Sequence, residues 1–184
     1  MKKPMSDAPI STQLFINGEA RPASDRGTYL LHNPARPAEL VGHVAAGTEG
    51  DVDAAVEAAH RAFPAWAALS YDERAAMLNR VADLLTANEA EVDARSQLFT
   101  REHGKIRRET MLEITRLGDR FRQNAAYASR LAQDEHISGP PFDTIVTRHP
   151  RGVAVLVVPW NWPLAILGAK LPQALIAGNT VVVK

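Results

Sequence analysis

Residues 152–184 constrain the fold more than any other stretch of this chain. Two runs rich in β-branched residues, 153–158 and 180–183, flank a longer apolar segment with a helical pattern. Pro159 ends the first run, and the turn pair Gly178-Asn179 precedes the second. The order strand, helix, strand predicts a parallel pair, because a crossover helix is the usual way to join strands that run in the same direction.

The same stretch is apolar enough to be compared with a membrane-spanning helix. Between residues 153 and 183 its one charge is Lys170, but three prolines interrupt it. Asn161 and Asn179 would also be costly in hydrocarbon. We therefore interpret the stretch as buried strands and a helix, and we expect no membrane partner.

The first part of the chain predicts a hairpin, then loops, then a helix. Residues 14–16 followed by Asn17-Gly18 indicate a two-residue hairpin turn. Residues 20–50 are punctuated by proline and glycine, which is typical of short extended pieces and loops. Helical periodicity begins at Asp51, and Pro64 should end or bend that helix. Its apolar stripe consists of Val52, Ala55, Val56, Ala59, Phe63 and Trp66.

Capping signals mark the helices that follow. Ser70 and Glu73 have the spacing of a capping box, and Asn88 and Glu91 repeat the signal. Gly104 is a suitable C-terminal cap for the helix that Asn88 opens.

A further long helical pattern covers residues 106–131, and a strand follows it. One face of the helix is apolar, with Ile114, Leu117, Phe121, Ala125, Ala128 and Leu131. Residues 139–141 break the helical region, and the alternation in residues 144–149 predicts a strand that is at least half exposed.

Charge and cysteine content narrow the classes of function. Acidic and basic residues balance, 21 against 21, so the sequence indicates no nucleic-acid partner. There is no cysteine, which excludes a disulfide, a thiolate metal site and a thiol nucleophile within this chain and fits a cytoplasmic location. The histidines lack the spacing of a metal site, so we expect no metal: His32, His43, His60, His103, His136 and His149.

Two polar residues are expected at the carboxyl ends of the two strands, where parallel sheets bind ligands. Asn161 follows the first strand and could donate a hydrogen bond to a developing oxyanion. Lys184 ends the second strand and could bind ribose hydroxyls or a phosphate. Lys170, inside the apolar helix, could carry protons. Each also has a structural interpretation, a turn residue for Asn161 and solvated cations for the lysines, and the GxGxxG fingerprint is absent.

At these residues the chain strongly resembles the NAD(P)-dependent aldehyde dehydrogenase superfamily. The string Pro159-Trp160-Asn161-Trp162-Pro163, followed by Lys170 and by residues 178–184, carries the resemblance. Upstream matches extend it over nearly the whole chain: residues 14–18, Asn33-Pro34, Trp66, Arg74, residues 102–105 and residues 148–153.

The resemblance implies an α/β fold, with an N-terminal helical layer and the first strand–helix–strand of an incomplete Rossmann-like cofactor-binding domain. Residues 1–12 start basic without an apolar run, so we expect a disordered leader there. The resemblance implies hairpin and helices in 13–136, a strand arm for oligomerisation in 137–150 and the nucleotide-binding unit in 151–184. The complete protein would be a homo-oligomer, a dimer or a tetramer.

The resemblance also implies roles for individual residues. Asn161 matches the oxyanion-binding asparagine, and Lys170 matches a lysine of a proton relay. The cofactor, NAD or NADP, would contact Val157, Val158, Pro159, Trp160, Asn161 and Lys184. The small-molecule substrate would be an aldehyde, oxidised to a carboxylic acid.

Departures from the family pattern leave alternatives open. The nucleophilic cysteine, the general-base glutamate and the glycines of the cofactor turn are not in this sequence, so we expect the chain alone to be inactive. Trp162 stands where phenylalanine is commoner, and Pro172 sits one place early. The alternatives are a non-catalytic module that binds cofactor or associates with itself, and a CoA-acylating semialdehyde dehydrogenase of the same superfamily.

Overall fold

The computed structural model describes residues 8–184, and these form two compact units. One unit contains the chain up to residue 58 together with residues 85–115, and the other contains residues 59–84 and 116–184. Each unit is therefore discontinuous in sequence. The segment boundaries expected from the sequence stay predictions, and the first seven residues of the expected leader lie outside the described part.

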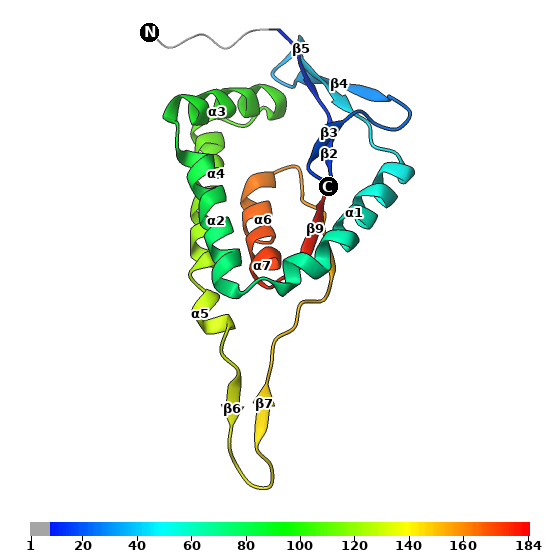
Figure 1. Ribbon diagram of the computed structural model, residues 1–184. Coiled ribbons are helices and arrows are strands. Elements are labelled where there is room, and N and C mark those ends of the chain that lie inside the picture. Colours follow the sequence, from blue (N-terminus) through cyan, green and yellow to red (C-terminus); the bar gives the residue numbers. More distant parts are fainter. Residues whose placement is uncertain (1–7) are drawn as a thin grey trace. The chain divides into compact units, whose positions relative to one another are not determined.

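The first unit begins with five strands (Figure 1): β1 (Ile10–Thr12), β2 (Leu14–Ile16), β3 (Glu19–Arg21), β4 (Thr28–Asn33) and β5 (Arg36–Ala45). β2 and β3 form the predicted hairpin, with Asn17 and Gly18 both at positive φ. The other three form a sheet in the order β1-β5-β4, in which β1 is parallel and β4 antiparallel to β5.

Two expectations for this region are wrong. Residues 10–12 of the expected leader are a strand, because the missing side chain of Gly42 lets the main chain of Ile10 come close. A Cβ on Gly42 would lie 2.7 Å from the carbonyl oxygen of Ile10. Residues 20–50 hold the ten-residue strand β5 rather than short pieces only. The register of β4 with β5 shifts between Leu31 and His32 and again between His32 and Asn33, so the pairing is irregular at this end.

Helices follow the strands: α1 (Glu49–Ala68), α2 (Tyr71–Thr86), α3 (Glu89–His103), α4 (Arg107–Ala125) and α5 (Ala128–Leu131). Pro64 does not end α1, which continues to Ala68. The predicted apolar stripe of α1 is not buried as expected, since Val52 is 56% and Val56 37% exposed.

The predicted caps are confirmed. Ser70 and Glu73 exchange the two hydrogen bonds of a capping box, with the Ser70 amide 2.7 Å from Glu73 Oε2 and the Glu73 amide 3.2 Å from Ser70 Oγ. Asn88 Oδ1 accepts from the amides of Ala90 and Glu91. Gly104 ends α3 in the left-handed conformation.

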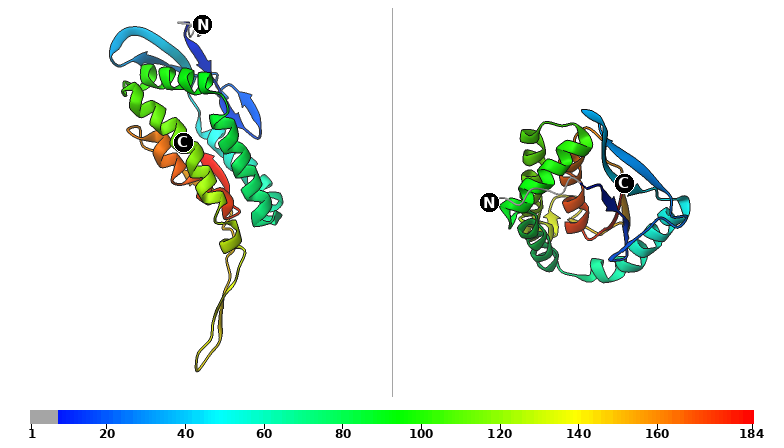
Figure 2. Two further views of the ribbon diagram at one scale, coloured as in Figure 1. Left: turned by 90° about the vertical axis from the view of Figure 1, so that its left-hand side faces the viewer. Right: turned by 90° about the horizontal axis from the view of Figure 1, so that it is seen from above.

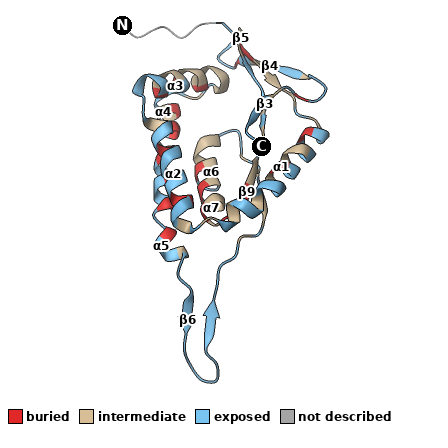
Figure 3. Ribbon diagram, in the orientation of Figure 1, coloured by how far each residue is buried: buried red, intermediate tan, exposed pale blue. Residues whose placement is uncertain are grey.

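The apolar face predicted for residues 106–131 is buried along α4 and into α5, with Leu131 partly exposed (Figure 3). The single helix expected there is interrupted at residues 126–127, so α5 is a separate turn.

The second unit ends with a hairpin and a strand–helix–strand segment: β6 (Glu135–Ile137), β7 (Thr144–Val146), β8 (Val153–Leu156), α6 (Pro163–Gly168), α7 (Leu171–Ile176) and β9 (Thr180–Val183). β6 and β7 are antiparallel and extend beyond α5 as a hairpin whose strands are exposed (Figures 2 and 3). β7 covers three residues of the longer strand predicted for 144–149.

Candidate functional site

The candidate site is built by the parallel pair β8 and β9. Their register runs from Val153 opposite Thr180 to Leu156 opposite Val183, so both strands end at the same edge. The predicted parallel pair is confirmed. The main chain of Lys184 is held between Leu156, the last residue of β8, and Val158, two residues beyond that strand: its amide donates to Leu156 O at 2.9 Å, and its carbonyl accepts from the amide of Val158 at 2.9 Å.

The residues predicted for a cofactor and an oxyanion follow the ends of these two strands. β8 ends at Leu156, two residues before the predicted end, and the chain leaves the sheet as Val157, Val158, Pro159, Trp160 and Asn161. Val157 is 64% exposed and Trp160 is 83% exposed. Asn161 and Lys184 are also exposed, which leaves the polar groups of this edge accessible to a ligand.

Lys170 does not lie inside an apolar helix, contrary to the prediction. The crossover consists of the two short helices α6 and α7, and Lys170 lies exposed at their junction. The reason is Pro172, which has no N–H to continue the ladder of α6 and instead sits in the first turn of α7, where a proline is tolerated.

The opposite edge is fixed by side chains whose role the sequence reasoning missed. Asn179 Oδ1 accepts from the amides of Arg151 at 2.7 Å and Gly152 at 3.1 Å, so the start of β9 is tied to the start of β8. Thr180 Oγ1 donates to the carbonyl oxygen of Ala59 in α1 at 2.8 Å. The signal was present in the Gly-Asn-Thr turn, but turn propensity alone did not indicate these partners.

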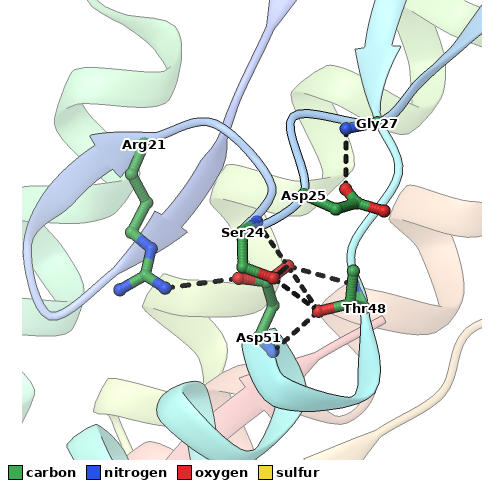
Figure 4. A network of polar contacts seen from close by, with 6 residues as sticks. All are labelled: Arg21, Ser24, Asp25, Gly27, Thr48 and Asp51. Carbon is green, nitrogen blue, oxygen red and sulfur yellow. Dashed lines mark hydrogen bonds and ion pairs between the residues drawn. The ribbon is translucent and has the colours of Figure 1, made fainter.

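A second polar cluster, around Asp51, is structural (Figure 4). Its carboxylate accepts hydrogen bonds from the amides of Thr48 and Ser24, both at 3.0 Å, and from the guanidinium of Arg21 at 3.2 Å. These bonds, the two amides foremost, hold the pKa of Asp51 far below its ordinary value of 3.8. Thr48 Oγ1 in turn accepts from the amide of Asp51, so the pair is a capping box for α1.

Two other titratable groups do not form a reactive site. Burial raises the pKa of Glu102, and the charge of His103 opposes this shift. His103 ends α3 and packs edge-on against Phe99, in agreement with a structural role for this pair. Arg36, Glu39 and Arg101 line an open pocket, and both arginines form ion pairs with Glu39.

The described residues contain no group of three or more His, Asp or Glu side chains placed to bind a metal ion. In the same part of the chain, every helix is too short or too polar to cross a membrane.

The edge of β8 and β9 fits a nicotinamide dinucleotide in the part that this chain supplies. The exposed ammonium of Lys184 follows β9, and the exposed Val157, Pro159 and indole of Trp160 follow β8. Such a combination suits a ligand that has both hydroxyl-bearing riboses and flat rings.

Known proteins share both the sequence and the fold. The model of the aldehyde dehydrogenase family matches residues 21–184. An α-ketoglutarate semialdehyde dehydrogenase from Haloferax volcanii is 36% identical over 171 residues, which are 92% of this chain and 35% of that protein.

Two solved structures resemble the chain closely. An NADP-dependent enzyme of E. coli matches with a TM-score of 0.86 and 32% identity, over 95% of this chain and 36% of that one. PnpE in complex with nicotinamide adenine dinucleotide matches with a TM-score of 0.82 and 36% identity, over 94% of this chain and 35% of that one.

The chain thus spans about a third of the length of these relatives. The family match covers nearly all of the described residues, including both strands of the candidate site and the segment between them. The expected α/β architecture agrees with the solved structures. This chain belongs to the aldehyde dehydrogenase family.

Proposed function

We propose that this chain forms one wall of the cofactor and oxyanion site of an NAD(P)-dependent aldehyde dehydrogenase, which oxidises an aldehyde to a carboxylic acid. The observation that carries the proposal is the parallel register of β8 and β9, whose strands end at one edge of the sheet. Asn161 follows the first strand and Lys184 follows the second, which supports a shared ligand site. The nicotinamide cofactors of the two similar solved structures support the choice of NAD or NADP.

We assign each residue of this wall a role from the chemistry of its side chain. When bound, the dinucleotide supplies the hydride acceptor. Asn161 donates from Nδ2 to the aldehyde oxygen as that oxygen gains negative charge. Lys184 donates from Nζ to the hydroxyls of the adenosine ribose. The apolar side chains of Val157, Val158 and Pro159 and the indole of Trp160 line the dinucleotide on the nicotinamide side.

We assign Lys170 a separate part in proton transfer. Its exposed position between α6 and α7 supports a role as the outer member of a relay, in contact with water, rather than as a buried base.

The sequence contains no cysteine, so the thiol that attacks the aldehyde has to come from outside these 184 residues. We therefore expect the 184-residue chain to bind dinucleotide without oxidising aldehydes. Aldehyde-dependent formation of NADH or NADPH by this purified chain would contradict that expectation.

The test separates the two roles by substitution. In a longer protein that contains this wall and the thiol, Asn161→Ala should lower kcat about 10²–10³-fold and leave the dinucleotide Kd unchanged. Lys184→Met should raise that Kd and leave kcat at saturating dinucleotide nearly unchanged. Arg108→Met, which removes an exposed cation of α4, is the matched control and should change neither.

Binding by the 184-residue chain can be followed through the fluorescence of the exposed Trp160 during titration with NADH and NADPH. A chain that binds neither dinucleotide would favour the non-catalytic, self-associating alternative over the proposed function.

We also propose that the complete protein is a homo-oligomer assembled through the β6–β7 hairpin. Four large apolar side chains of the hairpin are exposed, which supports its use as a contact surface: Ile137, Phe142, Ile145 and Val146.

A further inference from the structure

The buried guanidinium of Arg74 in α2 lies where three segments of the second unit meet. Arg74 is only 3% exposed. Its Nη1 donates to Leu69 O at 2.7 Å and, at longer distances, to Ala67 O and Trp66 O at the end of α1. Its Nε donates to Ile176 O at 3.0 Å, at the end of α7.

These acceptors lie at or just beyond helix C-termini, where the last carbonyls lack the usual partner within the helix and a nearby cation is favourable. Trp66 O also accepts from the amide of Leu69 at 3.3 Å, so Leu69 O and Ile176 O are the acceptors that matter most. Burial lowers the pKa of Arg74, but a guanidinium remains charged throughout the physiological range. Arg74 therefore acts as a charged clamp between the end of α1 and the end of α7, with Tyr71 stacked 4.5 Å from its Cζ.

The clamp lies directly against the turn that starts β9. A Cβ on Gly178 would lie 3.1 Å from Arg74 Nη1 and 3.2 Å from Pro150 Cβ, so a side chain there would press against both residues. Gly178 also has a φ of +91°, which other residues rarely adopt. The next residue, Asn179, fixes the start of β8 through the amides of Arg151 and Gly152.

Trp66 makes a second hydrogen bond to the end of α7, from a neutral donor. Its indole Nε1 donates to Leu175 O at 3.1 Å, one residue before the carbonyl that Arg74 binds. The end of α7 is thus held by two side chains of the α1–α2 segment. Because β9 is only four residues long, a shift of this turn moves the whole strand and its register with β8.

We propose that Arg74 is a positioning residue for dinucleotide binding: by clamping the end of α7 to α1 it sets where β9, and with it Lys184, lies beside β8. The role at Lys184 rests on the proposed function. The clamp itself does not, and the two can be tested separately.

The first test uses hydrogen exchange in the 184-residue chain without ligand. The readout is a ratio of two protection factors. The first is that of the amides of Val158, Thr180 and Lys184, which bond between the β8 and β9 segments. The second is that of the α4 amides of Leu117 and Phe121. Arg74→Met should lower this ratio about ten- to hundredfold, because bonds to a charged donor are lost. Arg74→Lys keeps the charge and should recover part of the loss.

Two further variants keep the test decisive if Arg74→Met folds poorly. Trp66→Phe removes one hydrogen bond at α7 and should lower the ratio by a smaller factor. Leu78→Ala, at a buried position of the same helix, reduces stability without removing a hydrogen bond and should leave the ratio unchanged. An unchanged ratio in Arg74→Met, or an equal fall in Leu78→Ala, would overturn the clamp.

The second test measures the Kd of NADH and NADPH. Arg74→Met should raise it about tenfold or more, since displacement of a binding group by even 1 Å is costly. A fall in the exchange ratio with unchanged affinity would overturn the positioning role and leave Arg74 a structural residue. If the unmodified chain bound neither dinucleotide, the proposed function would fail, and the exchange ratio would still decide the clamp.

Discussion

At the scale of single residues, Asp51 shows how a carboxylate can be structural although it lies in a polar cluster that looks reactive. Its hydrogen bonds come from two main-chain amides, two hydroxyls and one guanidinium, and it is 2% exposed. All of them favour the charged form, so the pKa is lowered and the carboxylate is a poor proton carrier near neutral pH.

The lowered pKa of Asp51 makes stability dependent on pH. The contribution of the charged carboxylate is fully present above its unfolded pKa, near 3.8, and is lost as the pH falls toward the folded pKa. Asp51→Asn should therefore destabilise the chain at neutral pH, and the difference from the unmodified chain should shrink in acid.

Denaturant unfolding at about pH 7 and about pH 3 measures this difference. Asp53→Asn, which removes the same charge from an exposed position of α1, is the control and should have little effect at either pH. A destabilisation by Asp51→Asn that persists undiminished in acid would contradict the assignment.

At the scale of elements, local signals set the helix ends, while packing decided which faces are buried. The capping box of Ser70 and Glu73, the cap Asn88 and the C-terminal Gly104 were all predicted because each acts on amides or carbonyls within a few residues. The stripe on α1 was predicted from periodicity and is partly exposed, because periodicity states which side chains share a face and not what covers it.

The cap of α3 gives a prediction at this scale. Asn88→Ala removes the acceptor for the amides of Ala90 and Glu91 and should cost about 1 kcal/mol of unfolding free energy. Asn88→Gly, which exposes the same amides to water, should cost only a few tenths of that amount, about 0.3 kcal/mol. A loss near zero for Asn88→Ala in denaturant unfolding would show that the side-chain bonds do not stabilise α3. A loss for Asn88→Gly as large as that for Asn88→Ala would show that water does not replace them.

At the scale of the whole molecule, the exposed β6–β7 hairpin is the surface through which we expect chains to associate. Ile145 is 58% and Phe142 78% exposed, and the hairpin makes its regular hydrogen bonds only within itself. Apolar side chains in this setting are stabilised by association.

We expect the chain to associate in a concentration-dependent way through this hairpin. Ile145→Lys places a charge among the apolar side chains and should shift sedimentation velocity profiles toward the monomer. Leu84→Lys makes the same change at an exposed position of α2 and should associate like the unmodified chain. Association that survives Ile145→Lys would place the contact elsewhere, for example at the outer edge of β9.

The sequence by itself determined the parts that depend on neighbours along the chain. These are the hairpin at Asn17-Gly18, the helix caps, the apolar face of α4, the parallel pair β8 and β9, and the shared edge at which these two strands end. Each follows from turn chemistry, from periodicity or from the rule that parallel strands share an edge.

Only the tertiary structure decided the rest. It joined residues 10–12 to β5 through the space at Gly42, and it divided the crossover at Lys170. It also joined Arg74 to a carbonyl 102 residues later in the chain. A guanidinium can bind carbonyls anywhere within its reach, so its partners depend on which chain ends folding brings together, and no local pattern contains that information.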